Sequence, residues 1–239
     1  MSSVSESEKS PRGGSGAMFD EIAPRYDQLN RMISFGLDQS WRRKAIACLH
    51  LQGKERILDL ATGTADLAIQ MAKLHPTVEV VGVDPSPRML EIGQHKVQQA
   101  KLEHQVQLYS GEAEHLDFPD KSFDAVTMAF GIRNVVDRQA ALQEIQRVTR
   151  PGGRVVILEL SESHGSMLAP FARFHARFVV PLLGALVSKK RAYRYLEQSI
   201  AAFPSPEAFS TMMNKAGFEV LNTVRLMGGV AHVYSATAR

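Results

Sequence analysis

Apolar residues along the chain fall into two kinds of block, which differ in the spacing of their apolar positions. Short runs typical of strands lie at 56–60, 78–83, 106–110, 123–130 and 154–160, and the run at 78–83 is rich in β-branched residues. Segments with helical spacing of apolar positions, typical of amphipathic helices, lie at 66–74, 87–100 and 137–148. This alternation of strand and helix predicts a parallel sheet with helices on both faces.

The two ends of the chain depart from this alternation. Helical pieces are predicted at 18–26, 29–33 and 39–49, before the first strand. Later, a helix over 207–216 precedes two strand-like runs, 218–226 and 230–236, which flank a Gly-Gly turn signal. These runs predict an antiparallel edge. We therefore expect a doubly wound, mostly parallel, Rossmann-like sheet of seven strands in a single domain over residues 18–239.

Two further segments bear on domain organisation and location. Residues 1–17 are rich in serine, glycine and charge and predict a disordered tail that lacks the apolar core of a secretory signal. An apolar segment at about 165–200 predicts a helical insertion within the domain. Nothing in the sequence reaches the roughly eighteen apolar residues of a membrane span. We expect a cytoplasmic protein.

Composition narrows the classes of function. The chain has 239 residues, of which 44% are hydrophobic and 22% charged, with a net charge of +3. The basic excess is small and no basic run is interleaved with aromatic residues, so we expect no nucleic-acid partner. The single cysteine, Cys48, excludes an internal disulfide and a cysteine-based zinc site, and we expect no metal.

The end of the first strand carries the features of a nucleoside-binding loop. In doubly wound folds the ligand lies beyond the carboxyl ends of the strands, where the strand order reverses. Here small residues at Ala61, Gly63 and Ala65 let a ligand approach the backbone closely. Asp84 ends the second strand, where a carboxylate can accept hydrogen bonds from both hydroxyls of a ribose. The sequence therefore predicts a cofactor that contains a nucleoside.

A dinucleotide and S-adenosylmethionine both fit that loop, and the charge of the loop favours the second. Asp59 and Asp66 bracket the loop, where they would repel a pyrophosphate but suit an ammonium and a sulfonium. The third glycine position of the dinucleotide pattern is Ala68. A tight turn that binds nothing is the structural alternative.

The ends of strands three and four add two candidate cofactor contacts. Glu112, in the segment Gly111–Ala113, can accept from the adenine amino group, and a solvated loop acid is the alternative for this residue. Ala129, near the end of the fourth strand, leaves room for the methionine part of the cofactor.

Several stretches match a known family. They are Met18–Ala23, Tyr26–Asn30, Ser34–Gly36, Trp41–Arg43, Arg147–Val148, Pro151–Gly153, Glu159–Ser161 and Tyr193–Leu196. The most specific stretch is Phe-Gly-Ile-Arg-Asn-Val at Phe130–Val135. On these residues the chain resembles the ubiquinone/menaquinone biosynthesis C-methyltransferases over about residues 18–237. It departs from their pattern at Asp38, where histidine is usual, and at Ala61 and Ala65, which replace glycines.

The resemblance implies a class I S-adenosylmethionine methyltransferase fold and a polyprenylated quinol substrate. We favour demethylmenaquinol, with 2-methoxy-6-polyprenyl-1,4-benzoquinol or another small phenolic or lipid metabolite as alternatives. A protein that binds the cofactor without catalysis is the rival of another class. The cofactor-binding residues that the resemblance implies are Thr64, Asp84, Glu112, Ala113 and Ala129, and the argument on the loop adds Asp59 and Gly63.

C-methylation requires a nucleophilic ring carbon, which a quinol acquires when a hydroxyl loses its proton. The expected catalytic residues are Arg133, Asn134 and Tyr26. Arginine is a poor base, so we assign it to stabilising the quinolate oxygen, with Tyr26 or water relaying the proton. Among the histidines, His164 is the best alternative base, although a buried structural role is the more common one for His164 and for His232.

The insertion is predicted to serve the polyprenyl tail. Its apolar residues recur at helical spacing over 167–187 and would form a channel, and its interleaved basic residues would face anionic head groups in a peripheral contact with a membrane surface. A lid helix packed on the core is the alternative. An exposed amino-terminal helix would also offer a surface for a homodimer.

Overall fold

The computed structural model describes residues 15–34, 36–161 and 190–239. Its strands are β1 (Arg56–Leu60), β2 (Glu79–Asp84), β3 (Val106–Ser110), β4 (Phe123–Ala129), β5 (Thr149–Leu160), β6 (Phe218–Leu226) and β7 (Ala231–Ala238). Its α-helices are α1 (Ser15–Ile22), α2 (Tyr26–Ile33), α3 (Leu37–Ala47), α4 (Asp66–Leu74), α5 (Pro87–Gln99), α6 (Arg138–Val148), α9 (Lys190–Ala201) and α10 (Pro206–Lys215).

The strands form one seven-stranded sheet in the order β3-β2-β1-β4-β5-β7-β6. Strands β1 to β5 pair in parallel, whereas β7 is antiparallel to both β5 and β6. The expected doubly wound, mostly parallel sheet with an antiparallel edge is confirmed. Its strand order reverses between β1 and β4, which places the ligand crevice of such a sheet at their carboxyl ends.

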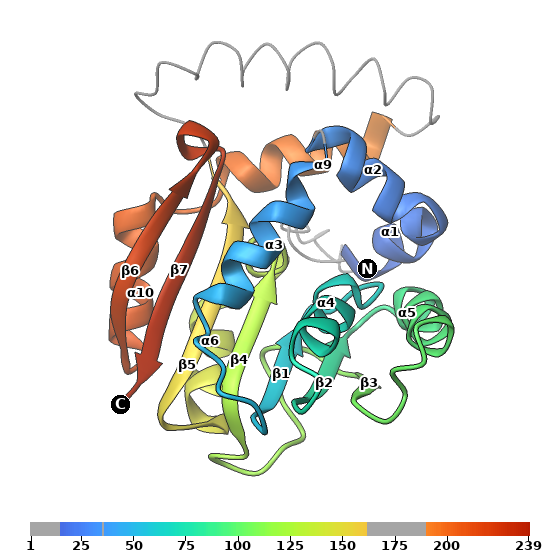
Figure 1. Ribbon diagram of the computed structural model, residues 1–239. Coiled ribbons are helices and arrows are strands. Elements are labelled where there is room, and N and C mark those ends of the chain that lie inside the picture. Colours follow the sequence, from blue (N-terminus) through green and yellow to red (C-terminus); the bar gives the residue numbers. More distant parts are fainter. Residues whose placement is uncertain (1–14, 35, 162–189) are drawn as a thin grey trace, which may run out of the picture.

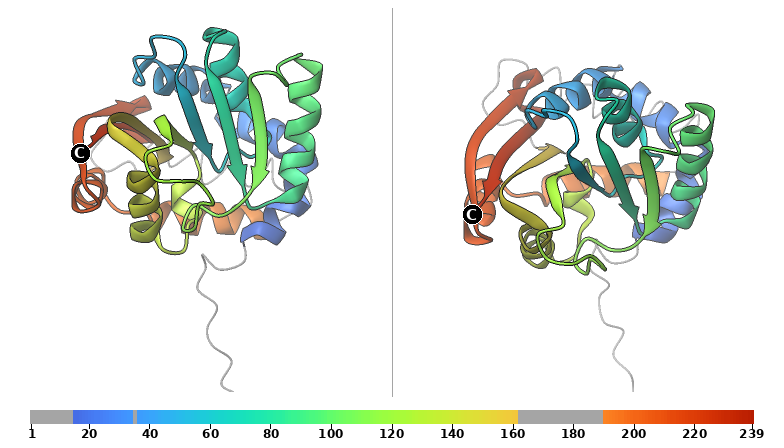
Figure 2. Two further views of the ribbon diagram at one scale, coloured as in Figure 1. Left: turned by 90° about the horizontal axis from the view of Figure 1, so that it is seen from below. Right: turned by 60° about the horizontal axis from the view of Figure 1, so that its bottom comes forward.

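Helices cover both faces of the sheet, as Figures 1 and 2 show, and each face has its own hydrophobic core. One core packs α3, α4 and α5 against the sheet and includes Trp41, Met71 and Val97. The other packs α6 and α10 against the opposite face and includes Ile145 and Phe209. Because side chains alternate between the faces of a strand, buried runs such as β1 contribute to both cores.

A third group of helices lies across the carboxyl ends of the strands. Figure 1 shows α2 and α9 above the ends of β1 and β4, with α1 beside them. Helix α1 packs on α5, and α9 packs on the short 3-10 helix η2 (Ile132–Asn134) that follows β4. These helices bring residues from both ends of the chain to the edge where the crevice lies.

Some boundaries differ from those expected. Helix α1 begins at Ser15, before the expected start at 18, and ends at Ile22 because Pro24 turns the chain into a 3-10 segment, η1 (Ala23–Arg25). Strand β5 begins at Thr149 and not at the expected residue 154. Thr149 already pairs with Phe123 of β4, and the pairing continues from Arg154 after a bulge at the Pro-Gly-Gly sequence.

Parts of two expected segments lie outside the described residues. They are most of the amino-terminal tail, residues 1–14, and most of the insertion, residues 162–189. Among the helices that are described, none is long and apolar enough to cross a membrane.

Candidate functional site

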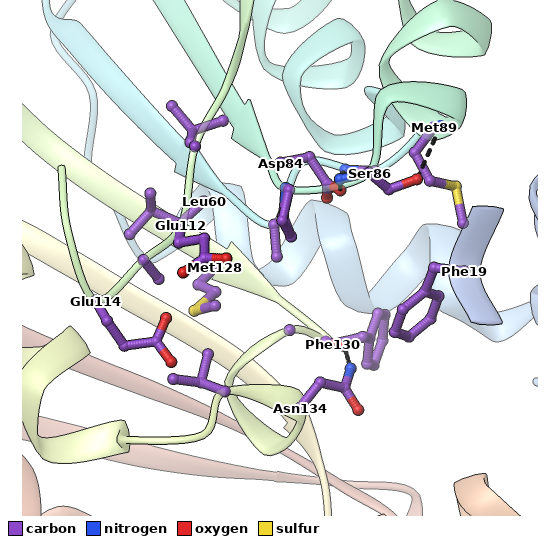
Figure 3. Close-up of a pocket in the computed structure, with 18 of the residues that line it drawn as sticks. Phe19, Leu60, Asp84, Ser86, Met89, Glu112, Glu114, Met128, Phe130 and Asn134 are labelled. Atoms are coloured by element: carbon purple, nitrogen blue, oxygen red, sulfur yellow. Dashed lines mark hydrogen bonds between the residues drawn. The ribbon is translucent and has the colours of Figure 1, made fainter. Parts of the chain in front are cut away.

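A cavity of about 320 Å³ lies at the carboxyl ends of β1, β2 and β4. Figure 3 shows Asp84 and Ser86 in its wall, together with Glu112, Glu114 and Asn134. The lining residues are Phe19, Tyr26, Leu60, Ala61, Gly63, Val83, Asp84, Pro85, Ser86, Met89, Gly111, Glu112, Ala113, Glu114, Met128, Phe130, Gly131, Asn134, Val135 and Val136.

Asp84 is held rigidly in that wall. Its Oδ2 accepts a hydrogen bond from the Gly63 amide at 2.8 Å, and its Oδ1 accepts one from the Ser86 amide at 2.9 Å. Burial raises the pKa of this carboxyl, and the two amide bonds oppose the rise. Each carboxylate oxygen keeps a second lone pair. Asp84 can therefore also accept from the hydroxyls of a ligand.

The loop after β1 has an unusual backbone that brings the chain close to the cavity. Ala61, Gly63 and Ala65 all adopt the left-handed conformation, with φ of 49°, 56° and 62°. For the two alanines this conformation costs roughly 1–2 kcal/mol each, which glycine would avoid. A Cβ added to Gly131 would lie 2.5 Å from the Cβ of Ala61, so the turn after β4 packs directly on this loop.

Asp59 lies beneath the loop and is not among the residues that line the cavity. It is 1% exposed and accepts hydrogen bonds from the hydroxyls of Thr62, at 2.7 Å, and Thr127, at 2.8 Å. Burial raises its pKa to about 6, although both hydroxyls and the charge of Arg42 oppose the rise. Asp59 can act on a bound cation through its charge, from below the loop.

Thr64 and Asp66 face the amino-terminal helices instead of the cavity. The Thr64 hydroxyl donates to Asp27 Oδ1 at 2.6 Å. The ammonium of Lys96, on α5, donates to Asp27 Oδ2 at 2.8 Å, to the Thr64 hydroxyl at 3.1 Å, and to Asp66. This cluster, which we call the α2 anchor, ties α2 to the loop and to α5.

Helix α1 is tied down by a second contact, next to Asp84. The Ser86 hydroxyl donates to Asp20 Oδ1 at 2.6 Å. Phe19 and Tyr26 thereby reach the cavity, and a Cβ on Gly63 would lie 3.9 Å from Cε1 of Tyr26. The amino-terminal helices thus form part of the wall of the cavity.

The loop after β3 supplies Glu112, Ala113 and Glu114 to the wall. The Glu114 carboxylate accepts from the Val136 amide at 3.1 Å, which links this loop to the segment after β4. Ala129, by contrast, packs against the core under α3 and is not among the lining residues.

Residues Phe130–Val135 form what we call the reaction turn. Its first residue, Phe130, has a left-handed φ of 60°, and Asn134 lines the cavity. Arg133 is 6% exposed, and its Nη1 donates to the Phe130 carbonyl at 2.7 Å and to Glu159 Oε1 at 2.6 Å. The Arg133 side chain thus lies behind the wall, paired with a carboxylate. The Tyr195 hydroxyl, from α9, donates to Asn134 Oδ1 at 3.2 Å.

The structure brings six of the ten expected site residues into one cavity. They are Tyr26, Gly63, Asp84, Glu112, Ala113 and Asn134. The other four, Asp59, Thr64, Ala129 and Arg133, lie in the layer behind its wall. Their assigned roles stay predictions.

Sequence reasoning gave no role to Glu114, Lys96 or Glu159. An acid in the apolar run of β5 was a signal that could have singled out Glu159.

Histidine and carboxylate side chains are the other groups that could carry chemistry. His164 lies outside the described residues, and His232 is buried with its Nδ1 2.7 Å from the Ser161 hydroxyl. Within the described ranges, no group of three or more histidine, cysteine or carboxylate side chains is placed to hold a metal ion.

The chain is similar in sequence to proteins of one known family. Residues 5–238 match the model of the ubiE/COQ5 methyltransferase family. The chain is 47% identical over 218 residues to a demethylmenaquinone methyltransferase of Thermus thermophilus, covering 91% of this chain and 98% of that one. It is 46% identical over 218 residues to the ubiquinone/menaquinone biosynthesis C-methyltransferase UbiE of Syntrophotalea carbinolica, covering 91% of each chain.

Solved structures share the fold at much lower identity. A SAM-dependent methyltransferase from Aquifex aeolicus aligns with a TM-score of 0.66 at 17% identity, covering 92% of this chain and 98% of that one. The cyclase SpnF aligns with a TM-score of 0.71 at 16% identity, covering 94% of each chain. Because a cyclase and a methyltransferase share this fold, the fold alone does not determine the reaction.

Proposed function

The chain belongs to the ubiE/COQ5 methyltransferase family, and on that premise we propose that it transfers a methyl group from S-adenosylmethionine to a ring carbon of a polyprenylated quinol. Demethylmenaquinol is the preferred substrate, supported by the 47% identity with the Thermus demethylmenaquinone methyltransferase. The name of the Syntrophotalea relative covers ubiquinone as well, which makes 2-methoxy-6-polyprenyl-1,4-benzoquinol the second candidate.

The charge of the cavity wall is the observation that carries this proposal. Asp84, Glu112 and Glu114 line it, and none of the lining residues in the described part of the chain is lysine, arginine or histidine. Such a wall repels phosphate groups and attracts a cation. It therefore fits S-adenosylmethionine, which carries an ammonium and a sulfonium, better than a dinucleotide.

Each part of the cofactor has a candidate partner in or behind this wall. Asp84 would accept from the ribose hydroxyls and Glu112 from the adenine amino group, while Asp59 would add negative charge from beneath the loop. Gly63 and Ala113 would pack against the ligand. When bound, S-adenosylmethionine supplies an electrophilic methyl group on its sulfonium.

The residues of the chain itself act on the quinol. Asn134 and Tyr26 line the cavity and can hold a ring oxygen by hydrogen bonds. Transfer of the quinol proton to solvent, relayed by Tyr26 or a water, is worth about 10²–10⁴-fold in rate. The positive charge of Arg133, behind the turn, favours the quinolate, and the aromatic side chains Phe19 and Phe130 exclude water from the ring. Orientation of the two reactants supplies much of the remaining rate.

The remaining expectations concern location and partners. We assign the insertion at about 165–200 to the polyprenyl tail, in a cytoplasmic protein that contacts the membrane surface peripherally and forms a homodimer. The lipid nature of a polyprenylated quinol supports the assignments to the tail and to the membrane surface.

Methyl transfer by the purified protein tests the function. The protein would be incubated with isotopically methyl-labelled S-adenosylmethionine and, separately, with demethylmenaquinol, the methoxy-benzoquinol and a simple phenol. We expect label in demethylmenaquinol most of all, and Asp84→Ala serves as the control for cofactor dependence. A folded protein that binds the cofactor by calorimetry but labels neither quinol would refute the proposal and favour a non-catalytic binding protein.

A further inference from the structure

Glu159 is a carboxylate on a strand face that is otherwise apolar. Val155 and Ile157 point into the core under α6 and α10, and strand alternation puts Glu159 on the same face. Its side chain is fully buried, at 0% exposure. A buried carboxylate requires strong partners to offset its lost hydration.

Among the residues that the structure describes, the hydrogen-bond partners of Glu159 are Arg133, in the reaction turn, and Leu160, its neighbour on β5. Its Oε1 accepts from Arg133 Nη1 at 2.6 Å and from the Leu160 amide at 2.7 Å. Its Oε2 accepts from the backbone amide of Arg133 at 3.1 Å. One carboxylate therefore holds both the side chain and the main chain of Arg133, and so fixes η2 relative to β5.

Tyr195, on α9, holds the same turn through a hydrogen bond to Asn134. Its hydroxyl donates to Asn134 Oδ1, while Asn134 Nδ2 points to the Phe130 carbonyl at 3.4 Å. Both ends of the Asn134 amide are therefore oriented by the protein. The amide nitrogen carries a second hydrogen, which is a donor for a substrate oxygen.

The charges of this cluster are coupled as well. Burial by itself lowers the pKa of Arg133, but the charge and the hydrogen bond of Glu159, together with the charges of Tyr26 and Tyr195, outweigh burial and raise that pKa. Residues from β5, α2 and α9 thus act on one guanidinium, that of Arg133 on η2.

Folding stability alone does not account for this arrangement. A buried ion pair can often be replaced by apolar residues at no loss of stability, so its presence beside a cavity points to a conformational role.

We propose that Glu159 and Tyr195 are positioning residues for methyl transfer, which hold the reaction turn so that Asn134 meets the quinol ring in the reactive arrangement, with Arg133 fixed behind it. The inference rests on the proposed function and deepens it. Neither residue touches the cofactor-binding wall at Asp84, so they act on turnover and leave cofactor affinity unchanged.

Glu159→Gln and Tyr195→Phe, singly and together, test this role. We expect each single variant to lower kcat for demethylmenaquinol by about tenfold or more, since small misplacements of a reacting group have effects of this size. The dissociation constant for S-adenosylmethionine, measured by calorimetry, should stay within about twofold of wild type. The double variant should lose less than the product of the two single losses, because both act through the same turn.

Two variants remove similar groups far from the turn and serve as matched controls. Glu144→Gln breaks the pair of Glu144 with Arg147, and Tyr109→Phe removes an exposed hydroxyl that donates to Gln107 at 2.8 Å. Both should keep the wild-type kcat.

Where Glu159→Gln folds poorly, Tyr195→Phe carries the test, because it leaves the buried pair intact. Wild-type kcat in Tyr195→Phe and in a folded Glu159→Gln would overturn the proposal. So would equal losses of kcat and cofactor affinity, which indicate a general loss of structure. A wild-type protein that methylates no quinol would instead refute the proposed function.

Discussion

Asp59→Asn tests whether the buried, ionised carboxylate of Asp59 destabilises the folded protein when no cation is bound above it. The pKa of Asp59 is raised from 3.8 to about 6, chiefly by burial. Two units of pKa correspond to about 3 kcal/mol, which is the cost of keeping this carboxylate ionised in the folded protein at neutral pH. The asparagine carbonyl keeps an acceptor for one threonine hydroxyl, and loss of the charge-assisted bonds offsets part of the gain. We therefore expect Asp59→Asn to be about 1–2 kcal/mol more stable than wild type at neutral pH.

The pH dependence of this difference identifies its cause. In the wild type, Asp59 binds its proton more tightly in the folded state than in the unfolded state. Between about pH 4 and pH 6 the folded protein therefore holds more protons, and the free energy of unfolding falls as the pH rises. The stability difference between variant and wild type should grow over this range and stay constant above it. The difference also contains the coupling of Asp59 with Asp84, whose charge contributes to the raised pKa of Asp59.

Thermal unfolding of both proteins from about pH 4 to pH 8 measures this difference, with an expected rise in Tm of about 2–8 °C for the variant at neutral pH. Calorimetry should show weaker binding of S-adenosylmethionine to the variant, because a carboxylate near the cation is gone. A variant that is less stable than wild type at neutral pH, or a difference that does not change with pH, would refute the reasoning.

Three other substitutions probe the wall and its supports. Asp84→Ala should weaken cofactor binding by about 1–3 kcal/mol in calorimetry, and unchanged affinity in a folded variant would contradict the placement of the ribose. Gly131→Ala should lower stability by about 1–3 kcal/mol in urea unfolding, because its Cβ would meet Ala61 at 2.5 Å; an unchanged midpoint would show that the turn can shift. Lys96→Met should cost under about 1 kcal/mol, since the anchor is partly exposed, yet it should speed limited proteolysis at α1 and α2. Equal cleavage rates would show that the anchor does not hold these helices.

Sequence reasoning was accurate where local patterns decide the structure. The bounds of β1 and α4 match the expected 56–60 and 66–74, because an apolar run ends in small residues there and helical spacing resumes at once. Asp84 was placed correctly at the end of β2, because strand ends in such sheets share one edge.

The directions of the loop side chains could not be predicted in the same way. Thr64 and Asp66 were expected at the ligand, but their partners are Asp27, 37 residues before Thr64, and Lys96, 30 residues after Asp66. Likewise, the pairing of Arg133 with Glu159 joins two strand ends that only the sheet order brings together. Contacts of this range depend on the whole tertiary structure, which local spacing does not encode.

The order in which the wall is assembled has a consequence during synthesis on the ribosome. Helices α1 and α2 precede their anchoring partners in the chain, since the contact of Asp20 with Ser86 spans 66 residues and that of Asp27 with Lys96 spans 69. In a nascent chain these two helices therefore lack their contacts with α5 until that helix has been translated, and Tyr195 joins Asn134 only 61 residues after the turn itself appears. The amino-terminal part of the cavity wall is thus fixed only after α5 has been made, and the contact of α9 with the turn forms later still.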